Sequence, residues 1–220
     1  MWGIFNPDNK FIRFLEGVYN LILLSLLWSI AALTVVGVGP ASTALYYAVS
    51  KSIKRGRSYP GREFFHALKN NWWKSILGGL LLMIFFLSAY FVDFPYISEW
   101  IVYGTSSNML MLILALVKLF FMFGIIIYFF PILSRFEVGA GKALSVSVIL
   151  IFRHLFSTIL LTVLILISIF IVMTEPISVL LVPGLYTFLS TYPIEWIMQK
   201  YMMNSDKEMD NSRDQWYLEN

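Results

Sequence analysis

The chain has 220 residues, of which 59% are hydrophobic and only 13% are charged, and its net charge is +3. Ordinary soluble domains carry about 25% charged residues, so this composition excludes a water-soluble core and predicts an all-α polytopic membrane protein. The absence of cysteine excludes thiol nucleophiles, disulfides and thiolate metal sites. The basic residues lie beside apolar segments, where they act as topology signals, so we expect no nucleic-acid partner.

Five apolar segments are long enough to cross a bilayer, which needs about 20 helical residues per crossing. They cover residues 18–38, 76–92, 109–130, 156–173 and 177–198. Only Thr174, Glu175 and Pro176 separate the fourth segment from the fifth, which predicts a tight helical hairpin. We expect one membrane domain over residues 1–203, followed by a mobile cytoplasmic tail over the polar residues 204–220.

The distribution of Lys and Arg predicts the orientation, because basic residues in short loops stay on the cytoplasmic side. Thirteen of the 16 basic residues lie between spans one and two, between spans three and four, or after span five. The loops after spans two and four contain Asp93, Glu99 and Glu175 and no basic residue. The sequence therefore predicts an N-terminus outside and a C-terminus in the cytoplasm.

A secretory signal peptide is the alternative for the first apolar segment, because the small residues from Ala41 to Ala44 follow it. The apolar run over 18–38 is longer than the roughly 7 to 15 residues of a signal peptide. The segment after it is the most basic in the chain, and moving it outward would break the charge rule. We therefore favour a first membrane span.

The segments expected on the cytoplasmic side have helical periodicity of their own. Ala41, Ala44 and Ala48 recur at helical spacing after Pro40, and a second short helix follows Pro60. An apolar run over 144–152 precedes span four in a similar way. We interpret these as amphipathic cytoplasmic helices that contact membrane lipids or a partner subunit. The candidate contact residues are Lys51, Lys54, Arg55, Arg57, Arg62, Phe64, Phe65, Lys69, Trp72, Arg135 and Arg153.

The polar residues offer little for catalysis, which needs a positioned acid, base, nucleophile or metal. His66 and His154 lie in different segments and lack the HExxH spacing of a zinc site. The chain contains no GxxxxGK[ST] loop and no GxGxxG motif, which are the familiar cradles for ATP and dinucleotides. We therefore expect no catalytic residue, cofactor or metal, and no enzyme activity.

Lys118 stands near the middle of the third expected span, where a basic residue costs roughly 2.5 to 3.5 kcal/mol. Its side chain should face protein or water. It is either a contact in a substrate path or with a partner subunit, or a structural lysine that bonds to neighbouring helices or snorkels. Asp93, Glu175 and Glu195 are the candidate acidic partners, and the sequence leaves the choice among them open.

The fifth expected span is interrupted by Pro183-Gly184 and by Pro193, which free backbone groups that lipid cannot satisfy. Neighbouring helices must supply those hydrogen bonds. Broken helices flank the binding sites of many transporters, which is one interpretation. A kinked packing helix is the other.

The order of several motifs resembles the YesL family of bacterial membrane proteins, a family of unknown function. The motifs are Phe5-Asn6-Pro7, then Gly39-Pro40-Ala41 at the end of the first span, then the basic turn Lys54-Arg55-Gly56-Arg57, and then Phe64-Phe65 leading into Lys69-Asn70-Asn71-Trp72. The likeness covers the chain to about residue 203, and Trp72-Trp73 departs from the pattern.

The resemblance implies a five-span protein of the bacterial plasma membrane, encoded in a carbohydrate-uptake context. We therefore expect a non-enzymatic component associated with a carbohydrate ABC importer, whose permease subunits and ATPase would be its partners. The alternative is a stand-alone transporter or channel for a small solute, which Lys118 and the broken fifth span suggest. The resemblance brings no catalytic residues with it.

Overall fold

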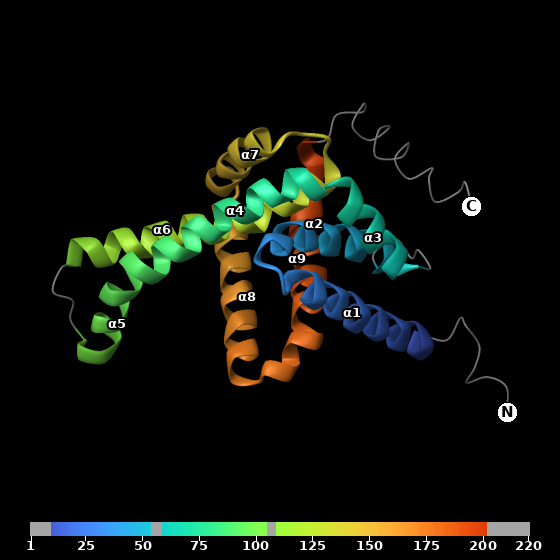
Figure 1. The fold of residues 1–220 in the computed structure, drawn as a ribbon, viewed down its shortest axis with the longest axis horizontal. Helices are drawn as coiled ribbons and strands as arrows, with labels where there is room; N and C mark the ends of the chain where they lie inside the picture. The colour runs from blue at the N-terminus through green and yellow to red at the C-terminus, as the bar shows by residue number, and fades with distance from the viewer. Residues whose placement is uncertain (1–9, 54–58, 105–108, 202–220) are drawn as a thin grey trace.

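The structure is a computed structural model that describes residues 10–53, 59–104 and 109–201 (Figure 1). Every regular element in these ranges is a helix, which confirms the all-α prediction. Lys54, Arg55, Arg57 and the tail predicted over 204–220 lie outside the described residues. The α-helices are α1 (Lys10–Ala32), α2 (Val38–Ala48), α3 (Pro60–Asn70), α4 (Trp72–Ser88), α5 (Phe94–Tyr103), α6 (Met109–Arg135), α7 (Ala140–Arg153), α8 (Leu155–Thr174) and α9 (Val182–Tyr201).

Four helical stretches among the described residues are long and apolar enough to cross a membrane. They are Phe14–Ala32, Trp72–Tyr103, Met109–Arg135 and Leu155–Thr174. The second stretch is continuous because a π-helical turn, Ala89–Asp93, joins α4 to α5. Residues 33–38 are not part of the first span, since the chain turns and enters α2 there.

The predicted fifth span over 177–198 is not among these stretches, so the count of five is corrected to about four. A short 3-10 helix, Pro176–Leu180, occupies its beginning, and α9 starts only at Val182. The residues of α9 that reduce its hydropathy include Thr187, Ser190, Thr191, Glu195, Gln199 and Lys200.

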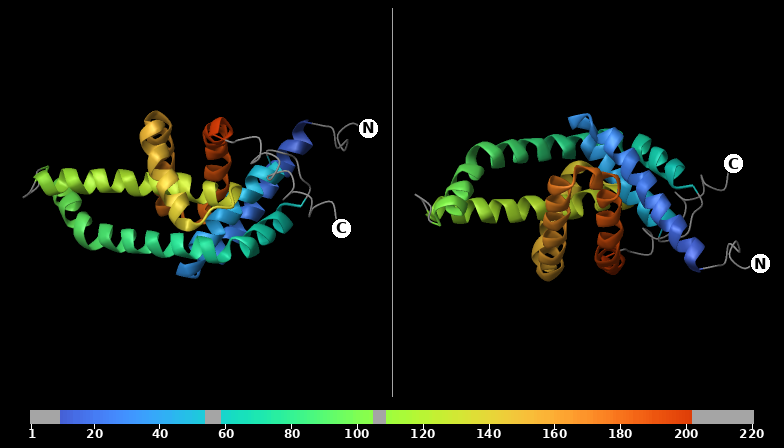
Figure 2. Two further views of the ribbon diagram at one scale, coloured as in Figure 1. Left: turned by 90° about the horizontal axis from the view of Figure 1, so that it is seen from above. Right: turned by 90° about the horizontal axis from the view of Figure 1, so that it is seen from below.

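Three arms leave a common centre in the ribbon view (Figure 1). The first is a long hairpin in which α4 runs outward, α5 forms the tip and α6 returns beside α4. The two further views show α4 and α6 side by side (Figure 2). The second is the hairpin of α8 and α9, and the third is α1. The arms meet around α2, which contacts α1, α3, α4, α6 and α9.

The central helix α2 is buried on nearly all sides, which corrects the prediction of an amphipathic surface helix. Each residue from Gly39 to Ala48 is buried except Ser42, which is half-buried. The alanines that recur at helical spacing in the sequence mark a close-packed interior helix, because small residues allow neighbouring helices to approach.

The crossing of α2 and α4 is too close for a side chain at Gly39. A Cβ atom there would lie 2.2 Å from the Ser75 carbonyl oxygen and 2.9 Å from the Gly79 amide nitrogen. A hydrogen bond of 2.9 Å between the Thr43 and Ser75 hydroxyls reinforces the same crossing. The contact of backbone with backbone fixes α2 against the long hairpin.

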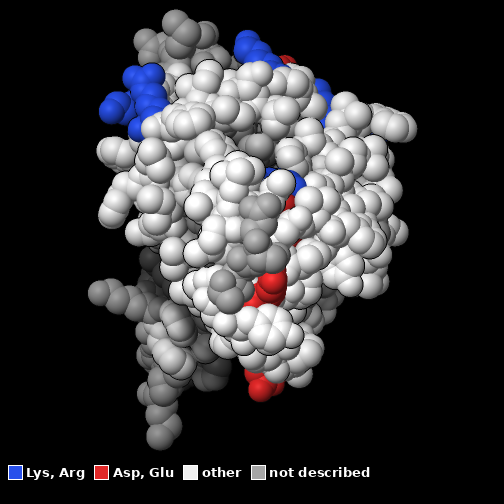
Figure 3. All heavy atoms as spheres, turned by 90° about the vertical axis from the view of Figure 1, so that its left-hand side faces the viewer, with Lys and Arg blue, Asp and Glu red and all other residues white. Residues whose placement is uncertain are grey.

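Helices α3 and α7 each have one packed and one exposed face. In α3, Phe64 and Ala67 are buried, whereas Phe65 is 56% exposed. In α7, Ala143 and Ile151 are among the buried residues, whereas Ile149 and Phe152 are exposed. Figure 3 views the end of the α4–α6 hairpin, where uncharged residues dominate and Lys and Arg gather toward the upper edge.

Candidate functional site

A buried cluster of charged and polar side chains joins three helices at the centre of the protein. Arg135 is the last residue of α6, Glu195 lies in α9, and Tyr46 lies in α2. The Arg135 Nε atom donates to Glu195 Oε1 at 2.9 Å, and its terminal NH2 group donates to Glu195 Oε2. The Tyr46 hydroxyl donates to Glu195 Oε1 at 3.3 Å. The carboxylate therefore receives a bidentate guanidinium and a third donor.

Arg135 and Glu195 are almost completely buried, with side-chain exposures of 3% and 5%. Burial raises the pKa of Tyr46 well above its usual range, the negative charge of Glu195 raises it further, and Arg135 opposes the shift. The Tyr46 hydroxyl consequently keeps its proton and acts as a donor. Because the two charges neutralise each other, the cluster is suited to holding helices together.

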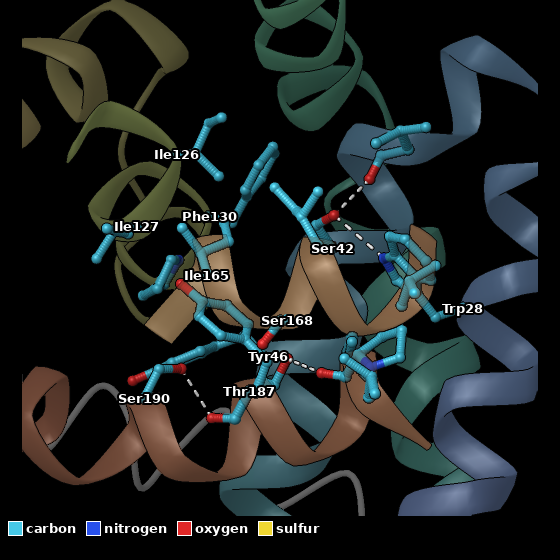
Figure 4. Close-up of a pocket in the computed structure, with 18 of the residues that line it drawn as sticks. Trp28, Ser42, Tyr46, Ile126, Ile127, Phe130, Ile165, Ser168, Thr187 and Ser190 are labelled. Carbon is cyan, nitrogen blue, oxygen red and sulfur yellow. Dashed lines mark hydrogen bonds between the residues drawn. The ribbon is translucent and has the colours of Figure 1, made fainter. Parts of the chain in front are cut away.

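A cavity of about 400 Å³ lies beside this cluster, between α1, α2, α6, α8 and α9 (Figure 4). Tyr46 belongs to both, since its ring lines the cavity while its hydroxyl binds Glu195. Most of the lining is aliphatic or aromatic, and Ile126, Phe130 and Ile165 are representative. The volume is within the range of roughly 300 to 1,000 Å³ that small-molecule sites occupy.

Most polar side chains around the cavity are already hydrogen-bonded within the protein. Trp28 Nε1 donates to the Ser42 hydroxyl at 3.2 Å, and Ser42 donates to the Val38 carbonyl at 2.7 Å. Ser168, Thr187 and Ser190 each donate to a carbonyl of their own helix at 2.8 Å. The cavity therefore presents few donors or acceptors to a ligand.

Lys118 pairs with Asp93, which settles the choice that the sequence left open. Its Nζ atom lies 2.7 Å from Asp93 Oδ2, in an ion pair rather than an aligned hydrogen bond, and donates to the Ser88 hydroxyl at 2.5 Å. The Asp93 side chain is 7% exposed and that of Lys118 is 30% exposed. The pair connects α6 to the π-helical turn between α4 and α5, far along the long hairpin from the central cluster.

The interrupted start of α9 receives its hydrogen bonds from α1, as the sequence requires of a broken helix. The Gly184 amide donates to the Ser25 hydroxyl at 2.8 Å, and that hydroxyl lies 3.3 Å from the Leu181 carbonyl, to which it donates. A Cβ atom at Gly184 would come within 2.6 Å of the same hydroxyl. Ser25 thus accepts from the Gly184 amide, which lies in the first turn of α9 and has no carbonyl one turn earlier in that helix to bond to.

The predicted contact residues divide into buried and exposed groups. Lys51, Phe64 and Arg135 are buried, so they do not form part of an exposed lipid or partner surface, contrary to that expectation. Lys51 Nζ lies 5.6 Å from the centre of the Tyr47 ring. The exposed residues are Arg62, Phe65, Lys69, Trp72 and Arg153, and their role as contacts stays a prediction.

A smaller polar cluster fastens the end of α9 to the junction of α7 and α8. His154 Nε2 and the Tyr201 hydroxyl are 2.8 Å apart, and the Arg153 guanidinium lies 4.9 Å from the Tyr201 ring centre. Lys200 lies over the Trp196 ring. Burial lowers the pKa of His154, and the positive charges of Lys200 and Arg153 lower it further.

The Arg135–Glu195 pair was missed by the sequence reasoning, which assigned Arg135 to a cytoplasmic surface. One signal pointed to it: each residue lies near the inner end of an expected span. Span ends on the same side of the membrane approach one another, and lone charges at such depth need partners. Within the described ranges, no three His, Asp or Glu side chains lie together as metal ligands would.

Two comparisons with known proteins locate the chain among its relatives. Residues 21–94, which run from α1 to the beginning of α5, match the family described as "Protein of unknown function, DUF624". The "Uncharacterized protein YesL" of Bacillus subtilis (strain 168) is 27% identical over 158 residues, which cover 70% of this chain and 72% of that protein. These matches support a YesL-like family assignment. No solved structure matches the chain. The family match contains α2 and its crossing with α4 and leaves out α6 to α9, where Arg135 and Glu195 lie.

Proposed function

We propose that this YesL-like chain is a non-enzymatic integral membrane component that associates with a carbohydrate ABC importer and supports its assembly, stability or regulation. The supporting observation is helix α7, which connects the candidate spans α6 and α8. Its buried side packs on the protein, whereas Ile149 is 59% exposed and Phe152 is 61% exposed on the other side. The Phe152 ring also contacts the Phe121 ring of α6, at 5.4 Å between ring centres. An amphipathic helix with exposed apolar side chains is suited to a groove on another subunit.

The chemistry of the central site agrees better with this role than with sugar transport by the chain alone. A sugar site needs several polar groups aimed at hydroxyls. The hydroxyls of Ser42, Ser168, Thr187 and Ser190 bond instead to the protein, and Glu195 is neutralised by Arg135. The described residues that line the cavity therefore offer a carbohydrate neither a charged group nor a row of available hydrogen-bond donors.

Co-purification from native membranes tests the association. A tagged wild-type chain in mild detergent should recover a permease subunit and its ATPase. The double variant Ile149→Ala and Phe152→Ala should reduce that recovery by roughly tenfold or more, as loss of contact hot spots does. The matched control replaces the exposed Phe156 and Ile159 of α8 by Ala and should change recovery little. A wild-type chain that recovers no importer subunit would contradict the proposal.

A stand-alone transporter for a small solute is the second candidate, and the cavity beside the interrupted start of α9 favours it. Solute flux into liposomes that contain only this chain separates the two functions. Flux that depends on Lys118 or on cavity residues would support the transporter. Absence of flux for the oligosaccharides tested, together with importer recovery, would support the accessory role.

We also propose that the protein lies in the bacterial plasma membrane with its N-terminus outside and its C-terminus in the cytoplasm. The distribution of basic residues supports this orientation, and α9 returns along α8 (Figure 1). Since the chain has no cysteine, single cysteines can be introduced without background. An impermeant maleimide should label Glu175→Cys in intact cells and label Ser145→Cys only after lysis. The reverse pattern would contradict the orientation.

A further inference from the structure

We propose that the cavity between α1, α2, α6, α8 and α9 binds one acyl chain of a membrane phospholipid. The cavity has a volume of about 400 Å³ and lies among helices that include the candidate spans α1, α6 and α8. Two of its lining residues on α8 reach the outer surface, since Ile169 is 40% exposed and Met173 is 78% exposed. The cavity therefore borders the face of α8 that bilayer lipid would cover.

The chemistry of the lining selects an apolar ligand. Aliphatic side chains from three helices, including Ile126, Ile165 and Val182, form much of the wall. The serine and threonine hydroxyls in the wall are bonded to carbonyls of their own helices, so a polar ligand would lose hydrogen bonds to water without replacement. An alkyl chain loses none, and apolar cavities in proteins stay dry and accept such ligands.

Tyr186 gives the site one polar contact. Its side chain lines the cavity, and within the described ranges its hydroxyl has no hydrogen-bond partner, unlike the other polar side chains of the wall. One donor in an otherwise apolar cavity suits a long chain with a single acceptor near it, such as the ester carbonyl of a phospholipid. Free fatty acid shares the alkyl chemistry, but phospholipid is the form in which a bilayer presents it to the surface of α8.

Photo-crosslinking tests occupancy directly. The full-length protein is reconstituted with phosphatidylglycerol that carries a diazirine in the middle of one acyl chain. Labelled peptides should come from the cavity-facing parts of α6, α8 and α9. Ile165→Trp fills the cavity and should reduce their labelling at least about fivefold, because the indole occupies the space that the acyl chain would take. The matched control is Ile167→Trp, because Ile167 is 51% exposed on the same helix and lies outside the cavity.

Val179→Trp fills the cavity from the 3-10 helix Pro176–Leu180 and replaces Ile165→Trp if that variant does not elute as a single species with a wild-type melting temperature. Equal labelling of the wild type and a folded cavity-filling variant would overturn the proposal. A larger loss of labelling in Ile167→Trp than in the cavity-filling variant would also overturn it, because the label would then come from lipid on the outer surface of α8.

Native mass spectrometry shows whether the bound acyl chain belongs to a phospholipid or to a free fatty acid. The wild-type protein extracted from membranes should retain one phospholipid mass, and Tyr186→Phe should lower its retention roughly two- to tenfold, as loss of one hydrogen bond predicts. Retention of a fatty-acid mass in place of phospholipid would overturn the assignment of the ligand. Unchanged retention in Tyr186→Phe would overturn the assignment of Tyr186 as the donor to the ester.

Discussion

Replacement of Arg135 by methionine should show how strongly the buried ion pair holds α6 against α9. Methionine keeps an unbranched side chain of similar reach but carries no charge, so Glu195 would remain buried with only the Tyr46 hydroxyl as a donor. The carboxylate is 5% exposed and has no access to bulk water that could replace the guanidinium. The variant therefore isolates the cost of an uncompensated charge.

The magnitude follows from the geometry of the pair. Opposite charges about 4 Å apart attract by about 4 kcal/mol at the effective dielectric of 20 that describes protein sites. Loss of one partner from a buried pair typically costs about 3 to 5 kcal/mol, whereas replacement of both by apolar residues is often neutral or stabilising. Arg135→Met and Glu195→Met should each lose about 3 to 5 kcal/mol of unfolding free energy, and the double variant should return to within about 1 kcal/mol of the wild type.

Equilibrium unfolding in mixed micelles, followed by tryptophan fluorescence, measures these free energies for the wild type, both single variants and the double variant. Arg153→Met is the matched control, because Arg153 is exposed and its contact with the Tyr201 ring should be worth only about 0.5 to 1 kcal/mol. Additive losses in the double variant, with a coupling energy below about 0.5 kcal/mol, would refute the reasoning.

Three further predictions concern other parts of the fold. Gly39→Ala should lose at least about 1 to 3 kcal/mol in the same unfolding assay, since its Cβ would meet backbone atoms, whereas Gly141→Ala, with open space around it, should not destabilise α7. Lys118→Met and Asp93→Asn should each lower the melting temperature, since each removes the counter-charge of a group in a candidate span; an unchanged melting temperature in both variants would contradict the pairing. For His154 the folded pKa is lower than the unfolded value of about 6.5, so the unfolded chain binds more protons and stability should fall as pH drops below about 6.5. If the melting temperatures of the wild type and of His154→Gln fell by the same amount between neutral and acidic pH, the result would contradict this prediction.

The sequence predicted the helical class and the approximate positions of four spans, because lipid imposes a length and an apolar character that local composition reveals. The fourth candidate span, Leu155–Thr174, differs by one residue at each end from the predicted 156–173. The prediction of a fifth span was wrong. The beginning of that segment is a 3-10 helix, and the rest contains a buried glutamate. Hydropathy averages over residues and takes no account of a partner such as Arg135.

The environment of α2 could not be predicted from its own residues. Alanines at helical spacing are compatible with a helix on the membrane surface and with a helix packed on every side, and only the positions of its neighbours distinguish the two. Gly39 marked the close crossing with α4, but its partner Gly79 lies 40 residues away in the sequence. Lys118 illustrates the same limit: its burial cost predicted a partner, whereas the fold decided that the partner is Asp93.

The position of Glu195 in the last described helix has a consequence for the order of synthesis. A nascent chain emerges from its N-terminus onward, so Arg135 enters the membrane before its counter-charge has been made. The bidentate contact can close only when α9 arrives and lies against α2 and α6. A chain interrupted before residue 195 would lack the carboxylate that receives the Arg135 guanidinium in the folded protein. Completion of the chain is thereby linked to closure of its interior.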